Sequence, residues 1–516
     1  MKQALSSAKD GQDEVLSLRR ELRDSHTRIE SLEHQLEWFK RQLFGRKSEK
    51  RQPEDIPEQP LLAGFEVEPA PSSKAADTET IRYTRRKQRG DDCVNDSGLR
   101  FNDSVPVQVI EMPAPELEGD DADDYEVISE KVTWRLAQRQ TSYVVLKYVR
   151  PVVKRKDTGK IHSPPAPTGL WDSAIVDVSF IAGMLVEKFI YHMPLYRQHQ
   201  KLGRDGIVLS RETLTQWCHR AIGLLEPIHQ AQLRHILQSK TLCIDETPVK
   251  AGRNKKGTMS LGWYWPIYGE DDEVAFTFST TRGSRHLVET LPDFTGTLLS
   301  DGHGAYTKFL RRIEEAEHAQ CWTHGRREFV RAEKSEPETI AQALDLIGVL
   351  FRIEKEIRDK ALTGEAKRAY RQAHAKPAVD AFFAWCDDQC QRMDLEPSYP
   401  LTKALKYVRK REQALRVYLD NPDVPIDTNH LERTLRVIPM GKKAWLFCWT
   451  EVGAKLVGIV QSLLTTCRLH GVNPTTYLTD VLQRVAVHPA ADVEQLTPRL
   501  WKQHFADNPM RSDVIV

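Results

Sequence analysis

The sequence predicts a multidomain, mainly α/β protein whose core is one mixed sheet with helices on its faces. The chain has 516 residues, and a single hydrophobic core rarely grows beyond about 250–300 residues before a chain splits into domains. Between residues 236 and 331, three short β-rich runs are followed by alternating helical and β-rich runs, which is the pattern of a sheet covered by helices. The flanking segments differ in periodicity, so we expect separate units there.

The composition leaves most classes of function open. The chain has 74 Lys and Arg residues against 73 Asp and Glu residues, a formal net charge of +1, so a nucleic-acid-binding surface would require local segregation of charge. Eight scattered cysteines without a C-x-x-C pair favour a reducing cytoplasm over a disulfide framework. The sequence shows neither a signal peptide nor a run of roughly 20 apolar residues. We therefore expect a cytoplasmic protein that does not contact a membrane.

Residues 1–48 are expected to form a coiled coil. Apolar residues recur with a seven-residue period over four heptads, which favours a homodimer or higher oligomer over a helix packed on its own domain. Residues 49–92 are rich in Pro, Glu, Ala and Ser and are expected to be a flexible linker with a basic end at 82–89. The first heptad position holds Val15, Leu22, Ile29, Leu36 and Leu43, and the second holds Leu18, Ser25, Leu32 and Phe39.

Residues 93–160 are expected to form a small antiparallel β module. β-Branched and polar residues alternate there, interrupted by the acidic loop GDDADD, as in short strands joined by loops. Between Val94 and Trp217 the chain has no cysteine. Apolar packing, with help from neighbouring domains, is therefore expected to hold the module together.

Residues 161–235 are predicted to be helical and to contain a helix-turn-helix. The run PLYRQHQKLGRDG is followed by SRETLTQWCHRAIGLL, where Ser210 and Thr213 suit the start of the second helix. An ordinary helical hairpin fits the pattern equally well. If the second helix is a recognition helix, four residues would face outward toward base edges and phosphates. They are Arg211, Thr215, Gln216 and His219.

The predicted core begins with three β-rich runs, TLCIDETPVK, GWYWPIYG and EVAFTFSTTRG. A helix, the strand GTLLSDGHGAY, a second helix and the strand AQCWTHGRREF are expected to follow. This is the order of a ribonuclease H-like sheet. The core is expected to span residues 236–331 and 416–485, with a helical insertion at 332–415 and a C-terminal segment at 486–516.

Three carboxylates are candidates for a catalytic metal site. Asp245 follows the run TLCI and Asp301 follows TLLS. The first and fourth strands of such a sheet are neighbours, so both side chains could bridge a cation. Taken singly, each Asp suits an ordinary turn, and Glu432 could belong to a capping box or a helical ion pair. As a set, the three carboxylates suit two Mg²⁺ ions, or Mn²⁺, about 3.5–4 Å apart, as two-metal phosphoryl chemistry requires.

Basic residues accompany these carboxylates. Downstream of Glu432 they lie where a phosphate backbone would approach the metals, and two more follow His324. The H-x-x-R spacing at His324 also occurs in tyrosine recombinases. The motif is expected to end a strand, and the chain has neither a second clear arginine motif upstream nor a suitably placed nucleophile after it. The motif is therefore either a chance match or a DNA-facing basic cluster. The candidate DNA-binding residues are Arg326, Arg327, Arg433, Arg436, Lys442 and Lys443.

Several longer motifs run along the chain: QLFGRKSE (42–49), PLYRQ (194–198), DETPV (245–249), SDGHGAY (300–306), CWTHGRREF (321–329), the block beginning DTNHLERTLRVIPMGKKAW at 427, and LTPRLWK near the C-terminus. Together they resemble the transposases of the insertion sequence 66 family. The resemblance implies a zipper-like N-terminus, a helix-turn-helix, and a ribonuclease H-like core whose Asp, Asp, Glu triad falls on Asp245, Asp301 and Glu432. It also implies recognition of terminal inverted repeats and metal-dependent DNA cleavage and strand transfer.

The resemblance carries one departure and leaves alternatives open. Members of the family usually have a small zinc-binding module with paired cysteines, which this chain lacks, so no structural zinc is expected. Such elements also encode helper proteins, which are possible partners. The alternative function is a catalytically inactive or helper-dependent DNA-binding transposition factor, which the intact triad disfavours. A ribonuclease H-like nuclease for branched DNA or hybrids would have less need of the zipper and the helix-turn-helix.

Overall fold

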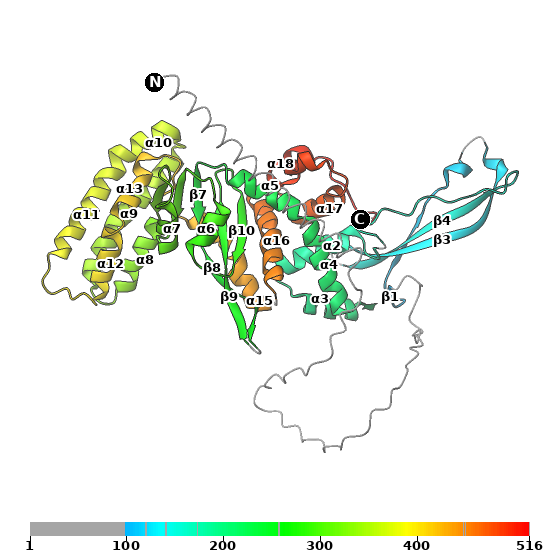
Figure 1. The fold of residues 1–516 in the computed structure, drawn as a ribbon, viewed down its shortest axis with the longest axis horizontal. Helices are drawn as coiled ribbons and strands as arrows, with labels where there is room; N and C mark the ends of the chain where they lie inside the picture. Colours follow the sequence, from blue (N-terminus) through cyan, green and yellow to red (C-terminus); the bar gives the residue numbers. More distant parts are fainter. Residues whose placement is uncertain are drawn as a thin grey trace, which may run out of the picture. The chain divides into compact units, whose positions relative to one another are not determined.

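The computed structural model describes residues 99–514 except 119, 120, 140, 141, 173, 256, 257, 447 and 449. The predicted coiled coil and linker therefore lie outside the described residues. From β1 (Arg100–Phe101) to α18 (Pro498–His504) the chain forms three sheets and many helices, as Figure 1 shows. The predicted mixed α/β class is confirmed.

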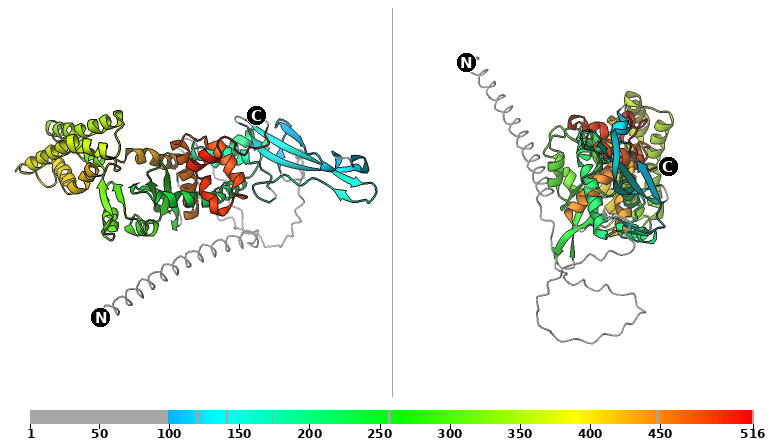
Figure 2. Two further views of the ribbon diagram at one scale, coloured as in Figure 1. Left: turned by 90° about the horizontal axis from the view of Figure 1, so that it is seen from above. Right: turned by 90° about the vertical axis from the view of Figure 1, so that its right-hand side faces the viewer.

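The β module differs from its predicted topology. β3 (Tyr125–Gln138) and β4 (Tyr143–Arg155) form a long antiparallel hairpin, visible in the left view of Figure 2. β2 (Val107–Glu111) pairs with β4 in parallel, whereas β5 (Ile161–His162) pairs with β4 in the antiparallel sense. The module is thus mixed and not wholly antiparallel. The segment between β2 and β4 contains the acidic loop and β3, and it is long enough to bring β4 back parallel to β2.

One face of this module is covered by the end of the chain. Ala137, Val144, Leu146 and Tyr148 are buried together, with Val514 packed against them. The Tyr148 hydroxyl donates a 2.7 Å hydrogen bond to the Asp513 carboxylate. Apolar packing and residues 513 and 514 together hold this face.

Four helices follow the module: α2 (Val178–Phe189), α3 (Leu195–Arg204), α4 (Arg211–Leu224) and α5 (Glu226–Ile236). The turn between α3 and α4 contains Gly206, whose φ of 82° favours glycine, and β6 (Ile207–Val208), which pairs with β1. Gly203 lies within α3, before this turn. The Ser210 hydroxyl accepts the Thr213 N–H at 3.0 Å and so begins α4 as a side-chain cap.

The central sheet has the strand order β10-β9-β7-β11-β12, and β8 pairs with β9 beside this path. β7 is antiparallel to β9 and β9 to β10, whereas β11 lies parallel to both β7 and β12. Helices α6 (Ser284–Thr290) and α7 (Gly304–Leu310) flank β11 in the sequence. The strands are β7 (Thr241–Ile244), β8 (Thr247–Lys255), β9 (Thr258–Tyr268), β10 (Val274–Ser279), β11 (Thr297–Ser300) and β12 (Glu317–Gln320).

The last predicted strand of the core is mostly a helix. β12 ends at Gln320, and α8 (Trp322–Ala332) begins two residues later. Trp322, Gly325, Phe329 and Ala332 are its buried residues, a three-to-four-residue spacing that fits one helix face and not the alternation of a strand. The His324 motif therefore lies in the first turns of a helix and does not end a strand.

A block of helices separates α8 from the segment that carries Glu432. The Arg371 side chain is fully buried in this block and pairs with the Glu354 carboxylate of α9 at 2.8 Å. Its Nη1 also donates to the carbonyl oxygens of Tyr418, Asn421 and Val424, and so fixes the exit from the block. The helices are α9 (Pro337–Asp359), α10 (Gly364–Tyr370), the π-turn η3 (Arg371–Ala375), α11 (Lys376–Cys390), α12 (Pro400–Arg409) and α13 (Glu412–Asp420).

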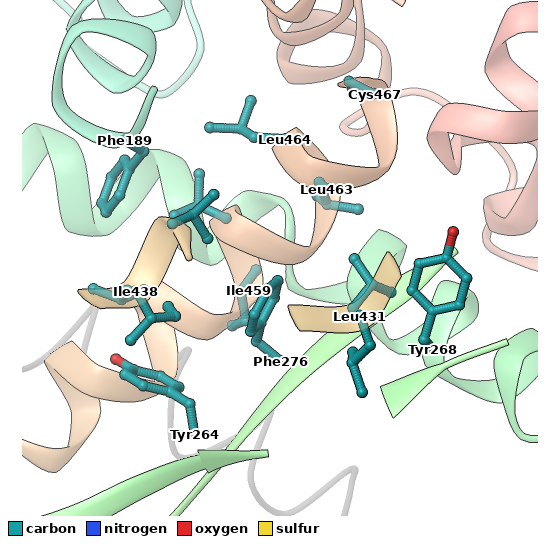
Figure 3. Packing of buried hydrophobic residues seen from close by; sticks show 14 of the residues in the cluster. Phe189, Tyr264, Tyr268, Phe276, Leu431, Ile438, Ile459, Leu463, Leu464 and Cys467 are labelled. Carbon is teal, nitrogen blue, oxygen red and sulfur yellow. The ribbon is translucent and has the colours of Figure 1, made fainter. Parts of the chain in front are cut away.

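The remaining helices close the core: α14 (Asn429–Leu435), α15 (Val437–Trp445), α16 (Glu451–Leu469), α17 (Pro474–Arg484) and α18. In Figure 3, Ile459 of α16 lies close to Phe276 of β10. The Ser462 hydroxyl accepts the Phe276 N–H at 2.8 Å. Within the described residues, α16 is long and apolar enough to cross a membrane, but 67% of its apolar 18-residue stretch is buried, which is typical of a core helix.

Arg371→Met should lower the free energy of unfolding by about 3–5 kcal/mol, because it leaves the Glu354 carboxylate buried without its partner. Urea unfolding of the full chain measures this loss. Arg368→Met is the matched control. It removes an exposed ion pair between Arg368 and Glu365, which are one helical turn apart, and it should change the free energy of unfolding little. Equal stability of the Arg371 variant and the wild type would show that this pair does not hold the block.

Candidate active site

Asp245 and Asp301 lie at the same level of the sheet, on neighbouring parallel strands. Thr241, Leu242 and Cys243 of β7 are paired with Thr297, Leu298 and Leu299 of β11. If this register is extended by two residues beyond the pair of Cys243 and Leu299, Asp245 lies opposite Asp301. Neighbouring strands are about 4.8 Å apart, so the strand pairing brings the two carboxylates to one edge of the sheet.

The Asp245 carboxylate is in an environment that disfavours its charge. Burial, and then the negative charges of neighbouring carboxylates, raise its pKa from 3.8 to about 7. Those neighbours are Glu246, Asp301 and Glu432, and the Glu246 N–H, which donates to Asp245 Oδ1 at 2.8 Å, opposes the shift. The raised pKa thus reflects burial first and the neighbouring negative charges second.

The loop after β11 is fixed by the helical block. The Tyr407 hydroxyl of α12 donates a 2.7 Å hydrogen bond to the Asp301 carbonyl oxygen. Gly302 has a φ of 83°, and a Cβ added to it would lie 2.7 Å from Arg411 Nε and 2.9 Å from Gln320 Oε1. Only glycine combines this backbone conformation with so close an approach, so a larger residue here would strain the loop that follows Asp301.

Glu246 is a buried residue at this edge that the sequence reasoning did not identify. Its Oε1 accepts 2.8 and 2.5 Å hydrogen bonds from Nε and Nη2 of Arg282, and the Tyr306 hydroxyl donates to Oε2. Because both oxygens are occupied, Glu246 serves to position the residue before it. The signal in the sequence was the carboxylate directly after Asp245, which reads equally well as part of a turn.

Glu432 reaches the same region from α14. Its carboxylate oxygens accept hydrogen bonds from Arg327 Nη2 of α8 at 3.1 and 3.3 Å. His324 Nε2 lies 3.7 Å from Glu432 Oε1, and burial, followed by the charge of Arg327, lowers the pKa of His324. Thr428 begins α14 without a side-chain cap. Glu432 therefore pairs with Arg327 of α8 and takes part neither in a capping box with Asn429 nor in a helical ion pair with Arg436.

The donor chemistry of this edge suits a hard divalent cation, because it consists of carboxylate oxygens. Across the part of the chain that the structure describes, no three Asp, Glu, His or Cys side chains are close enough to hold an ion together. The Glu432 oxygens face Arg327. Asp245 and Asp301 supply donors of the right kind, whereas Glu432 is engaged by a cationic side chain.

The candidate DNA-binding residues fall into two groups. Those of α4 are all exposed, and α4 packs against α2, α3, α5 and α16. The others surround Glu432 on α8, α14 and α15, where Lys442 Nζ donates to the Pro248 carbonyl oxygen of β8 at 3.4 Å. Arg211, Thr215, Gln216, His219, Arg326, Arg433, Arg436 and Lys443 are exposed, and Arg327 and Lys442 are half-buried.

Comparison with known families identifies the chain's relatives. The family model described as "Transposase IS66 family" matches residues 173–456, more than half of the chain, and includes the three carboxylates. The chain belongs to the IS66 transposase family. The model "IS66 C-terminal element" matches residues 462–499, and "Transposase C of IS166 homeodomain" matches 31–92. The last match covers part of the expected coiled coil and the whole of the expected linker, and supports a DNA-binding region there.

Relatives of similar length occur in Sinorhizobium fredii. The uncharacterized protein y4hP is 27% identical over 514 residues, which cover 93% of this chain and 90% of that protein. The uncharacterized protein y4jD is 28% identical over 359 residues, covering 66% and 68% of the two chains. The similarity to y4hP extends across nearly the whole chain, although neither relative's name gives an activity.

Asp245→Asn should stabilise the metal-free protein increasingly as the pH rises from about 4 to about 7. The folded protein binds the Asp245 proton more tightly than the unfolded chain, so ionisation above pH 4 costs stability until the folded pKa of about 7 is passed. Melting temperatures of wild type and variant in a chelating buffer, at several pH values, measure the difference. A difference that does not change with pH would contradict the buried, repelled carboxylate.

Gly302→Ala should destabilise the protein by about 1–3 kcal/mol, because the left-handed backbone becomes strained and the new Cβ meets Arg411. Gly304→Ala is the matched control, since no atom lies within 4 Å of a Cβ there and alanine favours the helix that begins at this residue. Chemical unfolding of both variants gives the comparison. If the two substitutions cost the same, the close packing around Gly302 is not a constraint.

Proposed function

We propose that this chain binds the terminal inverted repeats of its element and performs metal-dependent DNA cleavage and strand transfer, with Asp245, Asp301 and Glu432 as the catalytic residues. The observation that carries the proposal is the register of β7 and β11, which sets the two aspartates side by side. Membership of a transposase family supports a nuclease or transferase activity in general terms.

The proposed core is ribonuclease H-like. Three antiparallel strands, followed by two strands parallel to the first, in the order β10-β9-β7-β11-β12, support this assignment. Sites at the carboxyl ends of neighbouring parallel strands are common in α/β sheets. Both aspartates follow such ends, which supports their role over the reading of each as a simple turn residue.

Asp245 and Asp301 would together hold two Mg²⁺ ions, Glu432 would complete the second of the two sites, and Mn²⁺ could replace either ion. Oxygen-only donors favour these ions over Zn²⁺. When bound, such ions activate the attacking water or 3′-hydroxyl and stabilise the leaving oxygen. Glu432 would have to leave Arg327 to join the set, and the freed guanidinium would then be available to a DNA phosphate.

The remaining candidate residues would position DNA. Arg326, Arg433, Arg436, Lys442 and Lys443 would contact the backbone near the carboxylates, since phosphate contacts fix register without reading sequence. Arg211, Thr215, Gln216 and His219 would face base edges from α4. A homodimer or higher oligomer in the cytoplasm, aided by element-encoded helper proteins, would bring two ends together.

Glu432→Ala should bind element-end DNA with wild-type affinity, yet lose cleavage and joining by at least about 100-fold, since even residues behind a metal ligand contribute 10–100-fold. The measurement is an in vitro assay with end DNA and target DNA in Mg²⁺, with gel-shift binding in parallel. Glu365→Ala, an exposed carboxylate of the helical block, is the matched control and should retain both activities.

Other outcomes separate the alternatives. If neither wild type nor variant joins DNA although both bind it, helper proteins are added. If the wild type is still inactive with them, the chain is a DNA-binding transposition factor. Cleavage of branched DNA or hybrids without joining would indicate a nuclease. Wild-type activity in single variants of all three carboxylates would overturn the assignment of the site.

A further inference from the structure

An exposed apolar residue lies in a strained turn between α15 and α16. Leu446 is 65% exposed and has φ 68° and ψ −51°, a conformation that non-glycine residues rarely adopt. Val452, at the start of α16, is 64% exposed. Both exposure of a leucine and strain of its backbone cost free energy, and strain of this kind is found most often at functional sites.

The turn is held firmly on both sides of Leu446. After it, the Cys448 N–H donates to the Lys250 carbonyl oxygen at 2.9 Å, and the Cys448 carbonyl oxygen accepts the Gly252 N–H at 3.1 Å. Before it, Trp445 packs at 5.9 Å from the Phe189 ring, with the Lys188 ammonium 5.0 Å from its centroid. Leu446 is therefore presented to solvent by an anchored turn and does not belong to a frayed helix end.

The surroundings of the turn are basic. Residues 433–455 contain five Lys and Arg residues and one acidic residue, Glu451. Lys442 lies one helical turn before Leu446, Lys443 is exposed beside it, and Lys250 is exposed on β8 where the turn is anchored. An apolar side chain among cations suits DNA, whose phosphates need the charge and whose stacked bases accept an apolar group.

The position of the turn relative to the carboxylates follows from β8. The strand begins two residues after Asp245, and the turn is anchored to it at Lys250 and Gly252. At about 3.3 Å per residue, these positions lie no more than about 17–23 Å from Asp245 along the chain. With a duplex rise of about 3.4 Å, that distance corresponds to about five to seven base pairs.

We propose that Leu446 is a wedge that inserts between bases of the bound DNA within about seven base pairs of the cleavage site, while Lys250, Lys442 and Lys443 hold the flanking phosphates. The proposal rests on the proposed function. Apolar side chains used in this way unstack a base step and bend the duplex, which brings more phosphates onto a basic surface.

The test uses end duplexes that each carry one 2-aminopurine, scanned through the ten base pairs next to the cleavage site and bound by the full chain without Mg²⁺. Wild type should raise the fluorescence at one position, because the base there loses its stacking. Leu446→Gly should abolish the rise while its melting temperature stays equal to or above that of wild type, since glycine tolerates the positive φ. Val487→Ala, another exposed apolar residue, should retain the rise.

Each further result counts against the wedge. The wedge proposal is overturned, and the proposed function stands, in two cases. In the first, wild type binds and cleaves end DNA but the 2-aminopurine fluorescence rises at no position. In the second, Leu446→Gly retains the rise in fluorescence. If Leu446→Gly lowers the melting temperature or dissociates an oligomer, Leu446 belongs to a core or to a contact between copies of the chain. If wild type does not bind end DNA at all, both proposals are overturned.

Discussion

The parallel pairing of β7 with β11 is the constraint on which the rest of the site depends. Its register places two carboxylates, 56 positions apart in sequence, at one level of the sheet. Burial beside like charges makes that arrangement unfavourable in the absence of a cation, as the raised pKa of Asp245 indicates. The protein keeps it because the surrounding structure fixes both loops: Arg282 and Tyr306 hold Glu246 after one strand, and Tyr407 and Gly302 hold the turn after the other.

Glu432 reaches this edge after a helical block of 84 residues (337–420), and contacts at the end of the block set its position. Arg371 fixes the exit from the block, and the Trp322 N–H then donates to the Ile426 carbonyl oxygen. The Thr428 hydroxyl contacts the Cys321 sulfur, so α14 begins against the start of α8. The same helix, α8, carries Arg327, the present partner of Glu432. The block therefore contributes to the site in two ways. Tyr407 of α12 holds the Asp301 backbone, and the exit from the block leads directly to α14, which carries Glu432.

The sequence predicted the parts of this arrangement that depend on local pattern. The apolar runs TLCI and TLLS are the strands β7 and β11, and Ser210 begins α4 as expected. The parallel pairing of β2 with β4 was not predicted, because strand direction is set by the connection and not by alternation. The segment after Cys321 was taken for a strand because its aromatic residues favour strands, whereas burial follows a helical period. Glu246, Tyr407 and Arg411 were missed because their roles arise from contacts between distant segments.

The account's central claim is that Asp245 and Asp301 share a divalent cation. The most direct measurement is the anomalous X-ray signal of Mn²⁺ in crystals of the full chain bound to end DNA. We expect a peak between the two carboxylates, within about 2.0–2.3 Å of an oxygen from each, that Asp301→Asn removes. DNA cleavage in the same crystals without a metal peak at this edge, or with the peak bound elsewhere, would contradict the claim.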